Sequence, residues 1–260
     1  MSARSVHRCM LTDTTDWNAN THRHQQQIAI GRASVHSSSG DCARVFSRSD
    51  GIALCFLGDV TGHGPQAALL ARDLETRVSQ LAARMSPGAL LSSLNAALEA
   101  QWPAELFVSA VCFSFDCLTG AGTIALAGQM PPVVRSHSSS TPLDGHAGPA
   151  LGILPGQIYQ ESEFVLGVGD LLVAVTDGVT DPLATHRDLL GLAALARLVD
   201  GAPSDPHEVC ASLLGAAERF GIRDDATVLA VTPRWLDEPR ARGAVGRRKA
   251  CAATERRGAL

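Results

Sequence analysis

Two continuous apolar runs, each closed by an aspartate, constrain the fold of this chain more than any other feature. The first is Ile52–Leu57, followed by Gly58-Asp59, and the second is Leu171–Val175, followed by Thr176-Asp177. Such runs are typical of strands buried on both faces, and they are far too short to cross a membrane. Because a buried strand is held rigidly, we expect each aspartate at a fixed place where loops converge.

The rest of the chain alternates between helix-like and strand-like patterns. Apolar residues three and four apart predict a helix over 67–81, and Ser86-Pro87 is a typical start for a second helix, capped by the serine. Residues 107–115 alternate with period two, and the turn residues 116–122 that follow predict a hairpin. Further strands are expected at 28–35, 123–127, 157–165, 170–176 and 226–232, helices at 187–200 and 206–220, and a loop at 137–150. Hairpins with helices entering in adjacent pairs predict an antiparallel α+β domain.

Composition excludes several classes of protein. The chain has 260 residues, of which 45% are hydrophobic and 18% charged, which is typical of a globular protein. Its seven cysteines include no CxxC pair, so we expect free thiols in a reducing compartment, the cytoplasm, rather than disulfides or a zinc site. No basic segment leads into an apolar one at the start, so no secretory signal is expected.

Charge is distributed unevenly along the chain. Residues 234–260 carry a net charge of +5, which leaves −9 on the remainder for a total of −4. An acidic body argues against nucleic acid as a partner of the main domain. We expect a polar lead-in at 1–27, one folded domain at 28–233 and a basic, disordered tail at 234–260. Two roles for the tail stay open, solubilisation and binding to nucleic acid or an acidic partner.

Aspartates recur at the ends of predicted strands. Asp59 and Asp177 close the two apolar runs, Asp41 follows Gly40, and Asp224-Asp225 precede the last strand. A single aspartate beside a glycine is ordinary turn chemistry, but four such places in one chain indicate a shared purpose. Carboxylates brought together repel one another, and their burial is costly. Mg²⁺ and Mn²⁺ prefer oxygen ligands and relieve that cost, so the pattern predicts an oxygen-ligated metal site.

Five segments resemble, in order, the motifs of one family. They are Ser39-Gly40-Asp41, Gly58-Asp59-Val60-Thr61-Gly62-His63-Gly64, Ala127-Gly128-Gln129-Met130-Pro131-Pro132, Thr176-Asp177-Gly178-Val179-Thr180-Asp181 and Arg223-Asp224-Asp225-Ala226-Thr227-Val228. The family is that of the PPM (PP2C-type) metal-dependent protein phosphatases, in its bacterial branch of SpoIIE, RsbU and RsbX serine phosphatases. The resemblance spans roughly residues 28–233.

The resemblance implies a fold and a metal centre. The fold would be a PP2C-like central β-sandwich of two antiparallel sheets flanked by pairs of helices. The centre would hold two Mn²⁺ or Mg²⁺ ions. Asp59 would bridge both ions, and the backbone carbonyl of Val60 would bind one of them. Asp177 and Asp224 would complete the shell of the other ion, and Asp41 would reach metal-bound water.

Several positions depart from the family pattern or leave alternatives open. Asp225 adjoins Asp224 and is an alternative ligand. His63 is either a general acid or a turn residue held by local hydrogen bonds. Gln129 stands where the family's AGHPP segment often has His. Cys42-Ala43-Arg44 stand where the family usually has a second aspartate, which bears on the role of Asp41.

The resemblance also implies an activity. The chain would be a protein serine/threonine phosphatase in which a metal-activated water attacks phosphorus directly, without a phosphoenzyme. Its partner would be a phosphorylated protein, in the branch typically a small anti-sigma-factor antagonist of a partner-switching circuit, and no membrane is expected. The alternative is a non-catalytic scaffold of the same fold that binds a phosphoprotein. The intact Asp59, Asp177 and Asp224 argue for the enzyme.

Overall fold

The computed structural model describes residues 7–11, 24–35, 38–103, 105–137, 139–183 and 191–235. The basic tail expected at 234–260 falls outside them, apart from its first two residues. The elements are β1 (His7–Leu11), β2 (His24–Ser34), β3 (Asp41–Ser47), β4 (Ile52–Val60), α1 (Pro65–Leu81), α2 (Pro87–Gln101), β5 (Val108–Asp116), β6 (Ala121–Ala127), β7 (Val133–Ser136), β8 (Ser139–Pro142), β9 (Ala147–Gly148), β10 (Ser162–Val165), β11 (Leu171–Val175), α3 (Asp177–Thr180), the 3₁₀ turn η1 (Asp181–Leu183), α4 (Gly191–Asp200), α5 (Pro206–Phe220) and β12 (Ala226–Trp235).

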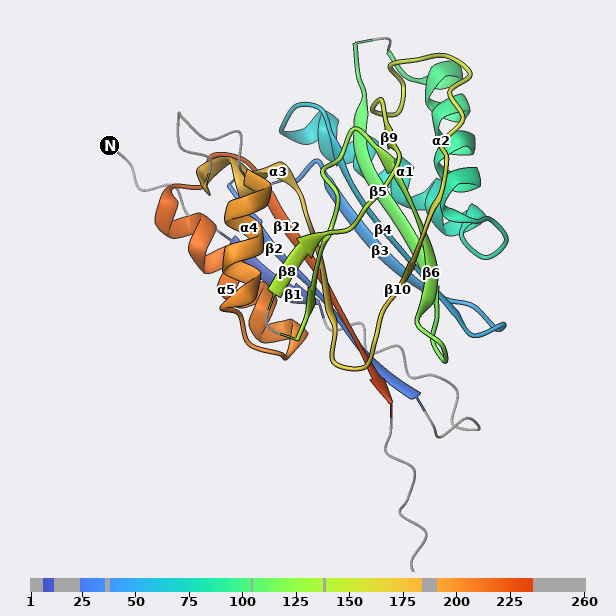
Figure 1. The fold of residues 1–260 in the computed structure, drawn as a ribbon. Helices are drawn as coiled ribbons and strands as arrows, with labels where there is room; N and C mark the ends of the chain where they lie inside the picture. Colours follow the sequence, from blue (N-terminus) through green and yellow to red (C-terminus); the bar gives the residue numbers. More distant parts are fainter. Residues whose placement is uncertain are drawn as a thin grey trace, which may run out of the picture.

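The strands form two sheets that pack face to face (Figure 1). Sheet A has the strand order β1-β2-β12-β11-β7-β8, and sheet B has the order β10-β6-β5-β4-β3. Neighbours along both orders pair antiparallel, and the two-residue β9 adds a parallel contact to β6. Helices α1 and α2 lie on the side of sheet B, and α4 and α5 lie on the side of sheet A. The predicted α+β sandwich is confirmed.

Apolar side chains fill three layers between these elements. Phe56 of β4 and Leu91 of α2 belong to the cluster between sheet B and its two helices, whereas Leu57 belongs to the cluster between the sheets. Val173 of β11 and Leu213 of α5 belong to the third cluster, between the outer face of sheet A and helices α4 and α5. Because the central strands are covered on both faces, they read as continuous apolar runs rather than as an alternation. This burial explains the two runs that the sequence shows at β4 and β11.

The helix starts follow from local polar contacts, with one correction. Helix α5 is capped by Asp205, whose carboxylate accepts from the backbone N–H of His207 at 2.9 Å. Helix α2 begins at Pro87 as predicted, but the side chain of Ser86 does not cap it. Instead Glu161 accepts from the backbone N–H of Gly88 at 2.8 Å and from the Ser86 hydroxyl. A carboxylate suits the positive end of a helix, and this one comes from the distant segment before β10.

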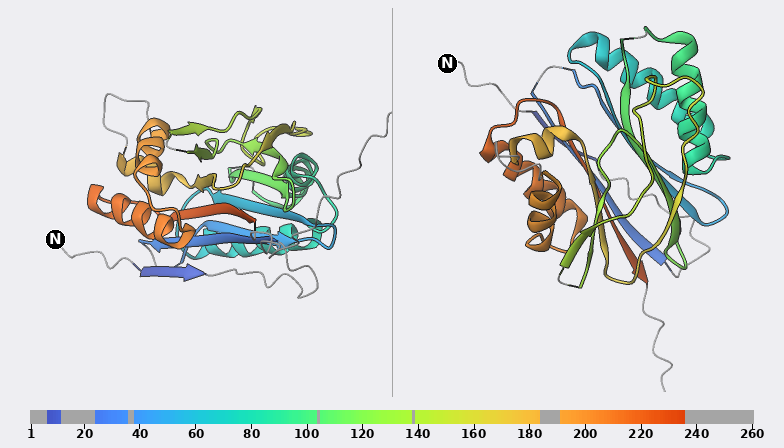
Figure 2. Two further views of the ribbon diagram at one scale, coloured as in Figure 1. Left: turned by 60° about the horizontal axis from the view of Figure 1, so that its bottom comes forward. Right: turned by 45° about the horizontal axis from the view of Figure 1, so that its top comes forward.

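Some strands differ from those expected. Neither β3 nor β7 was predicted, the strand expected at 157–165 is limited to Ser162–Val165, and the expected loop at 137–150 contains β8 and β9. In the region expected as a lead-in, β2 begins at His24 and β1 pairs along its edge (Figure 2). Strand pairing uses backbone groups, so a polar sequence does not prevent it. At the other boundary, β12 continues to Trp235, with Pro233, Arg234 and Trp235 all paired to β2.

Two further expectations concern cysteines and membranes. Cys42, Cys55, Cys112 and Cys210 are free thiols, as predicted for these four. Burial raises the pKa of the Cys210 thiol to about 12, so this sulfur stays protonated at neutral pH. Among the described residues no helix is both long enough and apolar enough to cross a membrane.

Candidate metal centre

The facing surfaces of the two sheets change from apolar to polar at one end. Side chains alternate between the faces of a strand, so Asp59 lies on the same inter-sheet face as Leu57, two residues earlier. In the same way Thr227 lies on the same inter-sheet face of β12 as Leu229, two residues later. The residues that extend the inter-sheet face in this manner are Asp41, Asp59 and Ser109 on sheet B, and Thr176 and Thr227 on sheet A. The candidate site is thus the polar end of the inter-sheet core.

Asp41 connects the two sheets at this end. Its Oδ2 atom accepts a hydrogen bond from Thr227 Oγ1 at 2.6 Å and another from Thr176 Oγ1 at 3.0 Å. The side chain is buried, with 4% of its surface exposed. Burial and then the charge of Asp59 raise the pKa of Asp41 well above its usual range, and the two threonine hydroxyls oppose that rise. Asp41 is therefore fixed in place from the opposite sheet.

Asp59 stands beside Asp41, its direct partner in the pairing of β3 with β4. Burial, followed by the charges of Asp177 and Asp224, raises the pKa of Asp59 to about 7. A hydrogen bond with the Asp41 carboxyl acts in the opposite direction. The Asp59 carboxyl thus lies between a buried acid on its own sheet and the acids of sheet A, and like charges gathered in this way disfavour ionisation.

Asp177 begins α3, the short helix that follows β11. The protein atoms that displace water around it, and then the charges of Asp181 and Asp224, raise its pKa. The next residue, Gly178, explains the glycine of this motif: a Cβ atom there would lie 1.9 Å from the backbone oxygen of Asp225. Only glycine permits this approach, so α3 lies directly against the start of β12.

Asp224 and Asp225 have different surroundings. Asp225 is buried, and its Oδ1 accepts from the backbone N–H of Val35 at 3.0 Å, which ties the end of β2 to the start of β12. Asp224 is exposed, and its Oδ1 accepts from the backbone N–H of Asp225 at 2.8 Å. The exposed carboxylate thus has capacity for a further partner, whereas the buried one serves the fold.

The turn after β4 is held by backbone contacts. Val60 N–H donates to the carbonyl of Gly40 at 3.2 Å, and a Cβ on Gly40 would lie 2.9 Å from the Val60 carbonyl oxygen. Gly62 and Gly64 have positive φ angles of 94° and 88°, which glycine adopts without strain. His63 lies between them and is exposed. The glycines of this motif are therefore needed for the shape of the turn.

The carboxylates are neighbours without forming a closed shell. Within the described parts of the chain, no three His, Cys, Asp or Glu side chains form a ready-made metal site. The charges of both Asp177 and Asp224 nevertheless raise the pKa of Asp59, so these three predicted ligands lie near one another. An oxygen-only, negatively charged donor set fits Mg²⁺ or Mn²⁺, and such an ion would offset the repulsion.

Sequence reasoning missed three polar residues of this site, Ser109, Thr176 and Thr227. Thr176 and Thr227 hold Asp41, and Ser109 is paired with Asp59 across β4 and β5. Thr176 and Thr227 belong to two of the five motif segments, and Ser109 belongs to the strand predicted at 107–115, but the sequence assigns none of them a role. The period-two pattern of the strands would have identified them, because each lies two residues from an apolar residue on the same face of its strand.

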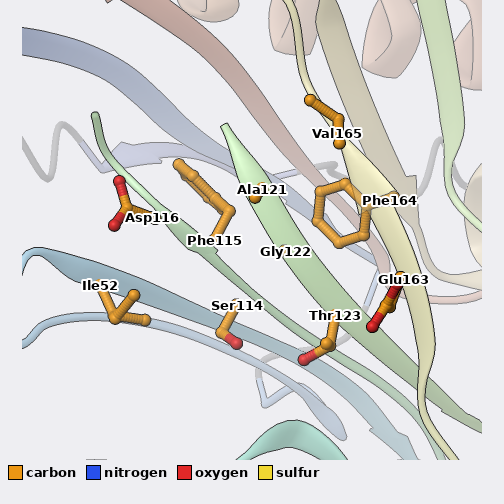
Figure 3. A pocket seen from close by; sticks show the side chains of 10 residues that line it. All are labelled: Ile52, Ser114, Phe115, Asp116, Ala121, Gly122, Thr123, Glu163, Phe164 and Val165. Atoms are coloured by element: carbon orange, nitrogen blue, oxygen red, sulfur yellow. The ribbon is translucent and has the colours of Figure 1, made fainter. Parts of the chain in front are cut away.

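A groove of about 530 Å³ lies away from these carboxylates (Figure 3). Its lining includes Ile52 and Asp116, which pair at one end of β4 and β5, whereas Asp59 and Ser109 pair near the other end of the same strands. The ring of Phe164 borders this groove. The candidate site is therefore identified by its chemistry and not by the size of a hollow.

Comparison with known sequences connects these features to one family. Residues 49–234 match the family described as Stage II sporulation protein E (SpoIIE). The phosphoserine phosphatase RsbU of Bacillus subtilis (strain 168) is 27% identical over 214 residues, which cover 79% of this chain and 63% of RsbU. The chain thus matches less than two thirds of the length of that relative.

Solved structures show the same fold. The RsbU and RsbW domains of Rv1364c from Mycobacterium tuberculosis superpose with a TM-score of 0.72 at 24% identity, over 82% of this chain and 60% of the other. The PP2C phosphatase domain of SpoIIE from Bacillus subtilis gives 0.73 at 17% identity, over 82% and 65%. More distant structures were solved with metal: RsbX with magnesium (TM-score 0.62, 15% identity, 81% and 96%) and PstP with two manganese ions (0.59, 14%, 81% and 98%). With the family match over residues 49–234, these likenesses identify the chain as a member of the SpoIIE family with a PP2C phosphatase fold.

Proposed function

We propose that this chain is a metal-dependent protein serine/threonine phosphatase. The observation that carries the proposal is the gathering of Asp59, Asp177 and Asp224 at one end of the sandwich, in a chain of the SpoIIE family. The relative RsbU is a phosphoserine phosphatase, which supports the same activity here. The raised pKa values of Asp59 and Asp177, in a chain of this family, favour a catalytic site over a structural one.

Five residues would form the metal site, four as ligands and Asp41 through metal-bound water. Asp59 is the proposed bridging ligand, since its carboxyl lies between Asp41 and the acids of sheet A. Asp177 and Asp224 would bind from sheet A, and the Val60 carbonyl and Asp41 would act from sheet B. PstP was solved with two manganese ions, which supports two ions in this chain. Asp224 is preferred over Asp225, because Asp225 already serves Val35.

Bound Mn²⁺ or Mg²⁺ would supply an activated water and neutralise charge on a phosphoryl group. The protein's own part in this chemistry is positioning. Thr176 and Thr227 fix Asp41, and Gly178 brings α3 against the start of β12. His63, exposed on the turn after Asp59, is a proposed proton donor to the leaving serine oxygen.

The proposed substrate is a phosphoserine or phosphothreonine of a small anti-sigma-factor antagonist, in the cytoplasm. RsbU-like relatives and a structure described as part of the bacterial stressosome support a partner-switching circuit.

The activity is tested by release of inorganic phosphate from a phosphoserine-containing antagonist protein, and from p-nitrophenyl phosphate. Release from both is expected with Mn²⁺ and is expected to stop in excess EDTA. Binding of the phosphoprotein without any release would favour the non-catalytic scaffold. Full release in EDTA that stops when cysteines are alkylated would contradict the metal mechanism.

A further inference from the structure

Gln129 makes a second side-chain link between the two sheets, separate from that of Asp41. Its Oε1 accepts from Ser109 Oγ at 2.6 Å, and its Nε2 donates to the backbone oxygen of Val175 at 2.6 Å. Ser109 belongs to β5 of sheet B, and Val175 ends β11 of sheet A. The orientation of the amide is fixed by its partners, because a backbone carbonyl accepts only and must face the Nε2 group.

Each partner of Gln129 leads directly to a proposed metal ligand. Ser109 is paired with Asp59 across β5 and β4, so the two side chains share one face. Val175 lies two residues before Asp177. The amide therefore joins β5, the neighbour of the strand that carries Asp59, to β11, the strand that leads to Asp177.

The sequence around Gln129 explains why a side chain is needed here. Strands β7 and β11 pair from Leu171 to Val173, with Val133 opposite Val173. Continuing that register would place Pro131 opposite Val175, and proline has no N–H to donate. Gln129 Nε2 supplies the missing donor to a carbonyl at a residue that is only 2% exposed, where an unsatisfied acceptor would be costly.

Gln129 itself is held in a fixed position. It is 9% exposed. Before it, Gly128 has φ of 72°, and a Cβ there would lie 2.8 Å from that of Ala150. Gly128 N–H also donates to the carbonyl of Gly148 at 2.8 Å. Because its backbone is held in this way, Gln129 can keep Ser109 and Val175 at fixed positions relative to each other.

We propose that Gln129 is a positioning residue that sets the separation between Asp59 and the ligands of sheet A. This role rests on the proposed metal-dependent function, and it does not require Gln129 to touch metal or substrate. Loss of the link would leave the fold in place, since Asp41 still joins the sheets, but would widen the range of distances between the ligands. Metal affinity is expected to fall, as it does when outer contacts of metal sites are removed.

The test compares Gln129→Met with Asn95→Leu. Both changes remove a buried amide and keep its approximate size. Asn95 is 1% exposed and links α2 to the segment after β9, by accepting from Gly152 N–H at 2.8 Å and donating to the Leu154 carbonyl at 3.1 Å. It has no contact with the proposed ligands in the described structure. Thermal melts over a Mn²⁺ series give the Mn²⁺ concentration for half of the metal-induced shift.

We expect Gln129→Met to raise that concentration about tenfold and Asn95→Leu to leave it unchanged, although both lower the melting temperature without metal. Gln129→His, which keeps one donor and one acceptor, is expected to restore much of the wild-type value. Ser109→Ala removes only one of the two bonds and serves if Gln129→Met does not fold. Amide hydrogen exchange in EDTA is expected to quicken at 175–178 in Gln129→Met.

Each outcome separates the two proposals. A wild-type Mn²⁺ response that Gln129→Met and Ser109→Ala leave unchanged would overturn the positioning role and leave the metal site standing. A wild-type protein with no response to Mn²⁺ or Mg²⁺ would overturn the metal site, and the role of Gln129 with it. Equal weakening by Asn95→Leu would show a general loss of stability and would also overturn the positioning role.

Discussion

Thr227 on sheet A donates its hydroxyl to the Asp41 carboxyl on sheet B over 2.6 Å. Asp41 is a proposed member of the metal centre, and Thr227 belongs to the same motif as Asp224-Asp225. The hydrogen bond shows why two motifs far apart in the sequence occur together in one chain. The later motif carries a proposed ligand and also fixes the side chain of an earlier one.

Thr227→Val is predicted to destabilise the protein by about 1–2 kcal/mol, because the buried Asp41 carboxyl loses a donor. Thr232→Val on the same strand is a matched control. Within the described residues, the buried Thr232 hydroxyl has no hydrogen-bond partner, so its removal is predicted to be neutral or slightly stabilising. Urea unfolding of both variants measures the difference. Equal losses would contradict the importance of the link to Asp41.

Gly178→Ala is predicted to cost at least about 2 kcal/mol, since the new Cβ would overlap the Asp225 backbone oxygen and neither backbone segment moves freely. Gly201→Ala is the control, because a Cβ there would come no closer than 3.9 Å to the surrounding atoms. It is predicted to change stability little. Chemical denaturation compares the two, and a Gly178→Ala protein as stable as Gly201→Ala would show that α3 is not packed against β12.

Asp224→Asn and Asp225→Asn form a pair that separates ligand from structural residue. Each change removes one charge and keeps an acceptor oxygen. Asp224→Asn is predicted to lose most of the Mn²⁺-induced rise in melting temperature. Asp225→Asn is predicted to keep most of it, because the amide oxygen still accepts from Val35 N–H. The reverse order would assign the metal to Asp225.

The pH dependence of metal-free stability is predicted from Asp59. Its pKa is raised from 3.8 to about 7 in the folded protein, so the folded state binds this proton more tightly than the unfolded chain does. The free energy of unfolding should therefore fall as the pH rises from about 4 to 7, and this contribution should level off above that. In Asp59→Asn the fall should be smaller. Urea unfolding in EDTA at several pH values measures it, and identical slopes would contradict the assignment.

Local patterns predicted much of the fold, and contacts between distant residues account for the rest. The runs at β4 and β11 and the period of α1 follow from burial, which is why these elements were predicted. The strand β3 was missed because Arg44 interrupts its pattern. In the structure Arg44 contacts Glu75 of α1 at 2.6 Å, a contact that no local rule contains. The cap of α2 by Glu161 is of the same kind.

At the candidate site, the sequence identified the acids but not their supports. Asp59 and Asp177 were predicted because each closes an apolar run. The roles of Thr176 and Gln129 depend on which strands face each other across the sandwich, and this follows from topology. The difference between Asp224 and Asp225 likewise depends on the distant Val35, so sequence left both open.

The most direct test of the account is the thermal stability of wild type and Asp59→Asn, each with EDTA and with saturating Mn²⁺. Without metal, Asp59→Asn is predicted to be as stable as wild type or slightly more stable, because one of several repelling carboxylates is neutralised. With Mn²⁺, the wild type should gain stability by RT ln(1 + [L]/Kd) and the variant should gain much less, with phosphatase activity nearly abolished. An Asp59→Asn protein with the wild-type Mn²⁺ shift and wild-type turnover would contradict the metal centre proposed here.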